Sequence, residues 1–156
     1  MRALLSLVSL AVVAAVPVTS RSADGGGLFT QNCLMCHQAG AVGLPGQFPR
    51  LAGRIAAISS QPKGRAYLID VLTYGMAGKI TVDDQPIVGL MPPFAQLSND
   101  EVAGVLSYVQ SLGRSPATTP AAFTAEEVRA GRAKTAKTAT DVRAERQSLE
   151  DAKIVP

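Results

Sequence analysis

A helical period of apolar positions is clearest in residues 98–112, near the middle of the second half of the chain. One stripe of apolar side chains runs along this segment, formed by Val102, Val105, Leu106, Val109 and Leu112. Ser98 and Glu101 have the spacing of a capping box, and Gly113 follows the last apolar position. The pattern therefore predicts an amphipathic helix over residues 98–112 that packs on a core.

Two further segments have helical patterning, and a region rich in glycine and proline separates them. Residues 25–36 place Leu28, Phe29 and Cys33 on one side, and residues 64–74 place four apolar side chains at helical spacing before Gly75. The intervening residues 38–61 contain Gly40, Gly43, Pro45, Gly46, Pro49 and Gly53. That composition predicts a long ordered loop between two helices.

The remaining segments predict one small strand pair and a charged tail. Residues 80–82 and 87–88 are β-branched and flank Asp83-Asp84-Gln85-Pro86, which predicts a small β-hairpin inserted into an otherwise all-α chain. Residues 114–123 have the composition of a linker. Residues 124–156 begin with a second capping pattern, and their mixed charges predict a helical or partly disordered tail.

The first 22 residues have the pattern of a cleavable signal peptide. Arg2 precedes an apolar run over residues 3–16, and small residues follow it. As a helix the run spans about 21 Å, short of the roughly 30 Å of a hydrocarbon layer, so an uncleaved anchor is the less favoured alternative. We therefore expect export to a periplasm and no transmembrane segment in the mature chain.

Charge and composition narrow the remaining classes. The chain has 15 basic and 12 acidic residues, and removal of the leader takes Arg2 and Arg21 with it. The nearly neutral remainder gives no support to nucleic-acid binding. Aromatic residues make up only 4% of the chain and tryptophan is absent, so a bound group is expected to complete the small core.

The reactive and metal-binding side chains are concentrated in one motif, Cys33-Leu34-Met35-Cys36-His37. It contains both cysteines and the only histidine of the chain. C-x-x-C-H is the spacing of c-type haem attachment. Near a helix end the two thiols can reach the two vinyl groups of a haem, and the next residue can place its imidazole under the iron. We therefore expect one covalent haem c, with His37 as an iron ligand.

Two other interpretations of the motif are weaker. A structural zinc site needs four ligands, and two cysteines with one histidine leave the fourth missing. A thioredoxin-like thiol pair belongs in a βαβ context that the chain does not predict. A haem-free thiol–disulfide protein therefore stays as a minor alternative.

The sixth iron ligand is expected to be a methionine. Met1 lies in the leader and Met35 lies inside the attachment motif, which leaves Met76 and Met91. Pro92 and Pro93 favour an extended backbone after Met91, so Met91 is the preferred ligand and Met76 the alternative. A histidine and a methionine together close both faces of the iron, which favours electron transfer over oxygen or peroxide chemistry.

Several short motifs resemble those of the class I c-type cytochromes. They are Gly25-x-x-x-Phe29 before the attachment motif, Pro49-x-Leu51-x-Gly53, Met91-Pro92-Pro93-Phe94 and the closing segment 105–109. The resemblance covers residues 24–113 and implies a small haem domain of three main helices. It also implies that the Pro49 carbonyl accepts the hydrogen bond of the axial imidazole, with Pro45 a less favoured acceptor, and that Leu51 packs on the haem.

The expected function follows from these residues together. We expect a periplasmic electron carrier or electron-transfer subunit, not an enzyme, that exchanges electrons with redox partner proteins such as a periplasmic dehydrogenase or a terminal oxidase. The alternative is a haem-based sensor or enzyme whose sixth position is open to a small ligand.

Overall fold

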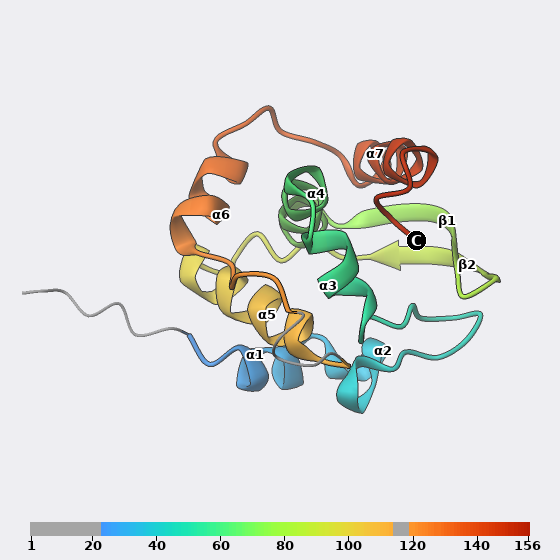
Figure 1. Cartoon of the computed structure of the whole chain (residues 1–156), viewed down its shortest axis with the longest axis horizontal. Helices are drawn as coiled ribbons and strands as arrows, with labels where there is room; N and C mark the ends of the chain where they lie inside the picture. The colour runs from blue at the N-terminus through green and yellow to red at the C-terminus, as the bar shows by residue number, and fades with distance from the viewer. Residues whose placement is uncertain (1–22, 114–118) are drawn as a thin grey trace, which may run out of the picture.

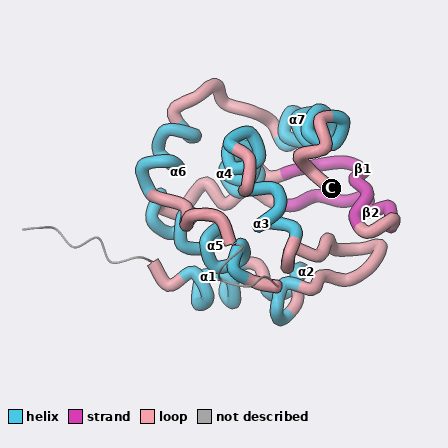
Figure 2. The backbone as a smooth tube through the Cα atoms, viewed as in Figure 1, coloured by secondary structure: helices cyan, strands magenta, loops and turns pink. Residues whose placement is uncertain are grey.

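Helices dominate the computed structural model, which describes residues 23–113 and 119–156 (Figures 1 and 2). The predicted leader, residues 1–22, and residues 114–118 of the predicted linker lie outside the described residues. The helices are α1 Gly25–Asn32, α2 Leu34–His37, α3 Arg54–Ser59, α4 Pro62–Tyr74, α5 Asn99–Ser111, α6 Ala125–Arg132 and α7 Ala139–Asp151. A 3₁₀ turn covers Ala39–Ala41, and β1 Met76–Val82 pairs with β2 Gln85–Met91 in an antiparallel sheet.

The N-terminal helical segment is divided into two helices, where the sequence predicted one. Cys33 leaves the helical conformation with φ −122° and separates α1 from α2. Its carbonyl then accepts the amides of Cys36 at 3.2 Å and His37 at 2.9 Å, so α2 is a single tight turn. The break places the attachment motif at a junction between helices.

Helix α3 lies where only a loop was predicted. It has six residues, and Gly53 precedes it in the left-handed conformation with φ 75°. Five of its six residues are buried, so no contrast between a polar and an apolar face marks it in the sequence. The expectation of a loop over all of residues 38–61 was therefore wrong for this segment.

The predicted hairpin is present and longer than expected. Asp83 and Asp84 form its two-residue turn with φ 51° and 59°, the positive values that a tight hairpin turn of this kind needs. The strands extend from this turn back to Met76 and Met91, which are paired with each other at the open end. The hairpin thus carries both candidate methionines to one place.

Helices α1 and α5 cross closely at a pair of glycines. A Cβ atom on Gly25 would lie 2.1 Å from the carbonyl oxygen of Gly104, so only glycine permits this approach. Next to the crossing, Phe29 is 2% exposed and its ring centroid lies 5.6 Å from that of Tyr108. The crossing fixes the position of α1 and of the motif that follows it.

The charged C-terminal segment forms α6 and α7, and both helices pack on the rest of the chain. Arg65 of α4 makes two hydrogen bonds to the Glu127 carboxylate of α6, at 2.6 and 2.7 Å. Lys137, just before α7, bonds Asp70 of α4 at 2.7 Å. Helix α7 also lies against β1, above it in the view of Figure 1. Whether residues 24–113 form a separate domain stays a prediction.

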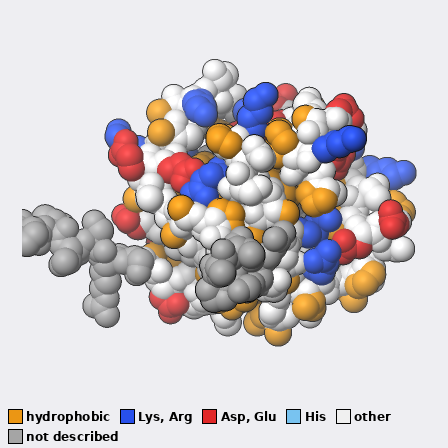
Figure 3. Space-filling view, in the orientation of Figure 1, with side chains coloured by type: hydrophobic (Ala, Val, Ile, Leu, Met, Phe, Trp, Pro, Cys, Tyr) orange, Lys and Arg blue, Asp and Glu red, His pale blue; other side chains and the backbone are white. Residues whose placement is uncertain are grey.

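The architecture is therefore mostly helical with one small antiparallel sheet. Within residues 23–113 and 119–156, no helix is both long and apolar enough to cross a membrane. On the face seen in Figure 3, acidic and basic side chains are scattered among apolar ones, in keeping with the nearly balanced composition.

Candidate functional site

The two cysteines and the histidine lie together at the junction of α1 and α2. Cys33 and Cys36 are both half-buried and free, with no disulfide between them. Burial, together with the neighbouring Cys36, raises the pKa of the Cys33 thiol to about 11. The Cys33 thiol is therefore held in its protonated form, and both cysteine side chains are unpaired and available for attachment to another group.

His37 is buried, 7% exposed, and one of its nitrogens is already engaged. Nδ1 lies 3.0 Å from the carbonyl oxygen of Pro49. Because a carbonyl only accepts, Nδ1 carries the proton and Nε2 keeps its lone pair. Burial lowers the pKa of His37, with the Pro49 hydrogen bond acting in the opposite direction. The neutral ring is thus fixed with a metal-binding nitrogen free.

The loop that supplies Pro49 is itself held by backbone hydrogen bonds. The carbonyl of Ala41, which is fully buried, accepts the amides of Leu51 at 2.9 Å and Ala52 at 3.1 Å. Gln38, directly after His37, has φ 61° and ψ 168°, a conformation that costs energy for a residue with a side chain. The turn after the motif and the loop at Leu51 are therefore fixed relative to each other.

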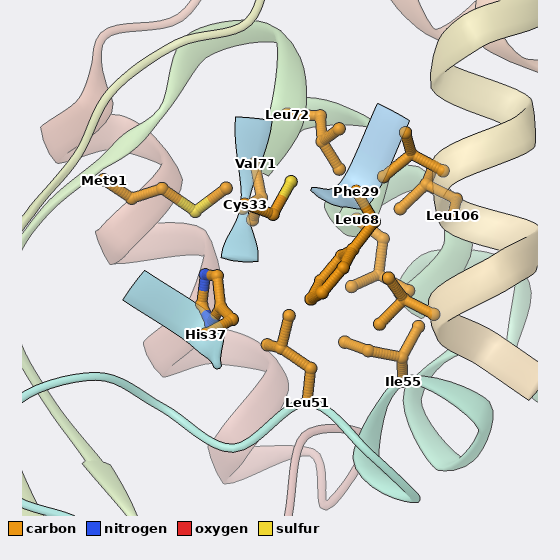
Figure 4. A pocket seen from close by; sticks show the side chains of 12 residues that line it. Phe29, Cys33, His37, Leu51, Ile55, Leu68, Val71, Leu72, Met91 and Leu106 are labelled. Carbon is orange, nitrogen blue, oxygen red and sulfur yellow. The ribbon is translucent and has the colours of Figure 1, made fainter. Parts of the chain in front are cut away.

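Two adjoining cavities meet at Cys33, His37 and Met91, which line both of them. The inner cavity has a volume of about 60 Å³ and the outer cavity about 250 Å³. In Figure 4, Met91, Cys33 and His37 lie toward one side of the inner cavity, and Phe29, Ile55 and Leu106 toward the other. Leu51 also lines the inner cavity, and its packing on a haem stays a prediction.

The hairpin forms a wall of the outer cavity. The hairpin residues that line this cavity include Met76, Gly78, Ile80, Ile87, Gly89 and Met91. These six are three directly opposed pairs on the two strands, so their side chains share one face of the sheet. Beyond Met91, the amide of Phe94 donates to the Leu72 carbonyl at 2.7 Å, which anchors the end of β2 to α4.

An ion pair joins the histidine side of the cavity to the hairpin. Arg50, between Pro49 and Leu51, makes two hydrogen bonds of 2.8 Å to the Asp83 carboxylate at the hairpin turn. The Arg50 guanidinium holds the pKa of Asp83 below its usual range. Both side chains are substantially exposed, so the pair positions the two segments more than it stabilises the fold.

The residues present fit a covalently attached haem. The donor set is two unpaired thiols at C-x-x-C spacing, one neutral imidazole and a thioether, which is the set that haem attachment and axial ligation use. The inner cavity is lined almost wholly by apolar side chains. Gly78 and Gly89 are opposed in the hairpin, and a Cβ on Gly89 would meet nothing within 4 Å, so the wall leaves room for a flat ring there.

One set of contacts at Met76 was not predicted from the sequence. Tyr67 of α4 donates from its hydroxyl to the Met76 sulfur at 3.5 Å, and Arg146 of α7 donates from Nη1 to the Tyr67 oxygen, also at 3.5 Å. These residues are distant in the chain. Since no motif connects them, only the fold reveals that they meet.

Comparison with known proteins identifies the family. The family model for cytochrome c oxidase, cbb3-type, subunit III matches residues 20–109. Cytochrome c-552 of Thermus thermophilus is 43% identical to this chain over 135 residues, which covers 81% of this chain and 97% of the relative. A second cytochrome c-552 of the same species is also 43% identical over 135 residues, with 86% of that relative covered.

The protein class is therefore that of an electron-transfer haem protein. The chain belongs to the c-type cytochrome family, as a monohaem member. Haem, iron binding and electron transport follow from that membership.

Proposed function

We propose that this cytochrome carries one electron at a time in the periplasm. A single haem c is attached through Cys33 and Cys36, with His37 and Met91 as the axial ligands. When bound, it supplies an iron that alternates between the ferric and ferrous states. The chain's own residues determine its axial ligands, its shielding from water and its access to a partner.

The geometry around His37 is the observation that carries the proposal. The Pro49 carbonyl orders the imidazole by a 3.0 Å hydrogen bond, and burial favours its neutral form. A ring held in this way keeps Nε2 ready to bind iron and strengthens it as a donor. Leu51, which follows in the same loop, supports exclusion of water from this side of the site.

Met91 is supported as the second ligand by its shared position with His37. Both residues line the inner and outer cavities, whereas Met76 lines only the outer one. A thioether ligand favours ferrous iron and therefore raises the reduction potential. With both axial positions taken, no position is left for a substrate, and the protein acts as a carrier or as an electron-transfer subunit.

Partner access is supported by exposed apolar side chains at the outer cavity. Met35 is 86% exposed and Leu90 is 69% exposed, and both line that cavity. An apolar rim allows a second protein to approach closely with little desolvation of charge. We propose a redox protein as the partner, such as a periplasmic dehydrogenase or a terminal oxidase, and export through the leader at residues 1–22.

Acid extraction followed by spectroscopy tests the attachment. In the purified protein the haem should stay with the polypeptide in acidified organic solvent, and the alkaline pyridine spectrum should be that of a haem with two thioether bonds. Cys33→Ser and Cys36→Ser provide matched variants, each expected to give a spectrum of single attachment or no haem at all. Full extraction of haem from the wild-type protein would overturn the proposal.

A further inference from the structure

The rim of the outer cavity carries no charged side chain. Among the described residues that line this cavity there is no lysine, arginine, aspartate or glutamate, and burial favours the neutral form of His37. The exposed large apolar side chains of the lining are Met35 and Leu90. A partner that docks at this rim therefore gains its contact energy there from apolar surface and not from ion pairs.

Met35 is the most exposed large apolar side chain in the described part of the chain, at 86%. It lies in α2 between the two cysteines, and its carbonyl accepts a hydrogen bond from Nε2 of Gln38 at 3.0 Å. This hydrogen bond holds the backbone of the residue, while the side chain extends into solvent. The Met35 thioether is therefore accessible to small reactive solutes.

The two methionines of the hairpin are less accessible. Met76 and Met91 are both partly buried and packed against the hydrophobic core. The iron bond proposed for Met91 also occupies a lone pair of its sulfur. Because oxidation of methionine follows exposure of the sulfur, a peroxide in water meets Met35 first.

We propose that Met35 is a site of reversible oxidation by peroxide, and that its sulfoxide weakens docking of the redox partner while leaving the iron site unchanged. In the reaction the O–O bond of hydrogen peroxide breaks and an S=O bond forms. The thioether loses two electrons, and the second oxygen of the peroxide leaves with both protons as water. This proposal rests on the proposed function, because it regulates the rim at which the partner docks.

The change in polarity explains the expected loss of docking. Oxidation converts a flexible apolar side chain into a polar one. A polar group that is buried against an apolar surface loses its hydrogen bonds to water without replacing them. Met35 is not among the proposed iron ligands, so the reduction potential and the sulfur-to-iron absorption band should both stay as they are in the unmodified protein.

The first experiment locates the modification. The ferric holoprotein is treated with dilute hydrogen peroxide, the reaction is stopped with catalase, and tryptic peptides are analysed by mass spectrometry. Trypsin separates the three methionines, because Arg50 and Arg65 lie between Met35 and Met76, and Lys79 lies between Met76 and Met91. One added oxygen should appear on the Met35 peptide before it appears on either of the other two.

The second experiment measures docking with a defined apolar probe, a gold electrode coated with a methyl-terminated alkanethiol layer. The protein concentration that gives half-coverage should rise by about tenfold after oxidation, as expected if part of one methionine side chain no longer contributes to apolar contact. Treatment with methionine sulfoxide reductases of both stereospecificities should restore the original value. Voltammetry on the same electrode should give an unchanged reduction potential.

Two variants at the same position are the matched controls. Met35→Leu keeps an apolar side chain without a thioether, so its adsorption should be close to wild type before and after peroxide. Met35→Gln places an uncharged polar side chain of similar length at the rim, so it should adsorb about as weakly as the sulfoxide without any peroxide. The pyridine spectrum and far-ultraviolet circular dichroism establish that each variant holds its haem and its helices.

The outcomes that overturn the proposal are distinct from failure of the proposed function. Oxidation of Met76 or Met91 before Met35 would overturn the site. A Met35 sulfoxide that adsorbs like the unmodified protein, an equal loss of adsorption in peroxide-treated Met35→Leu, or a wild-type protein that does not adsorb to the apolar layer would overturn the effect on docking. A wild-type protein without covalent haem would instead contradict the proposed function itself.

Discussion

The histidine side and the methionine side of the cavity are assembled from different distances along the chain. Cys33, Cys36, His37, Pro49 and Leu51 all come from residues 33–51 and are joined by short-range backbone and side-chain bonds. The methionine side combines a hairpin at residues 76–91 with α4 and α7. A local motif therefore defines the first side, whereas only tertiary packing defines the second.

This difference explains why the sequence offers one candidate for the first axial ligand and two candidates for the second. His37 has no competitor, since it is the only histidine in the chain. Met91 has a competitor directly across the hairpin, because Met76 is its partner in the strand register.

Loss of His37 should have the largest effect. His37→Ala removes the only imidazole and the contact to Pro49, so we expect almost no holoprotein to accumulate, because an empty apolar cavity leaves the small core incomplete. The measurement is the yield of haem-stained protein beside that of Met91→Ala, which should accumulate. Equal yields of the two variants would remove the distinction between the sides.

A larger side chain at the α1–α5 crossing should disturb the histidine side from outside it. Gly25→Val places atoms where the Gly104 carbonyl lies, so α1 must move, at a cost of about 3 kcal/mol or more. Thermal unfolding of the holoprotein checks this value. Gly46→Val is the control for backbone strain without steric crowding. A Cβ at Gly46 would meet nothing within 4 Å, but its φ of 74° disfavours any side chain. A Gly25→Val protein as stable as wild type would contradict the close crossing.

Elements with local sequence signals could be predicted, and elements that depend on tertiary packing could not. Helix α5 is predicted well because its capping box and apolar stripe are local, and the structure shows both bonds of the box. The Asp83-Asp84 turn is equally local. Helix α3 is missed because tertiary burial on nearly all sides leaves no period to detect.

The candidate site follows the same rule. Cys33, His37 and Met91 line both cavities, whereas Cys36 and Pro49 line only the outer one and Leu51 only the inner one. That these residues hold a haem stays a prediction. Contacts at Tyr67, Met76 and Arg146 could not be inferred, because a hydrogen bond between α7 and α4 has no signature in either segment. The C-terminal segment was expected to be a helical or partly disordered charged tail. It contains α6 and α7, and its charged side chains include partners for α4, such as Glu127 and Lys137.

Replacement of Met91 and of Met76 by alanine should have different effects on the reduction potential and on carbon monoxide binding. Met91→Ala should lower the reduction potential by on the order of 100 mV, because a ligand that favours ferrous iron is lost, and should allow carbon monoxide to bind. Met76→Ala should leave both properties close to wild type and cost about 1 to 2 kcal/mol of stability, since its side chain is half-buried. Redox titration of both variants makes the comparison. The reverse pattern would assign the ligand to Met76.

The smallest effect is expected at the contact between α4 and α6, remote from both sides of the cavity. The Arg65 guanidinium lowers the pKa of Glu127 below its ordinary 4.5, chiefly through their hydrogen bonds. The folded state thus binds fewer protons there than the unfolded state, and the contribution is present above pH 4.5 and declines as the pH falls below it. Glu127→Gln should cost about 0.5 to 1 kcal/mol at pH 7 and nothing at low pH, as measured by denaturant unfolding. A cost that does not change with pH would exclude the ion pair as its origin.

The sulfur-to-iron absorption band of the oxidised protein tests the central claim most directly, because it requires a methionine on the iron of a bound haem. Wild type and Met76→Ala should both show the band, and Met91→Ala should lose it while keeping its covalent haem. A band that survives Met91→Ala and disappears in Met76→Ala, or a wild-type protein without the band, would contradict the assignment of His37 and Met91 as the pair that holds the iron.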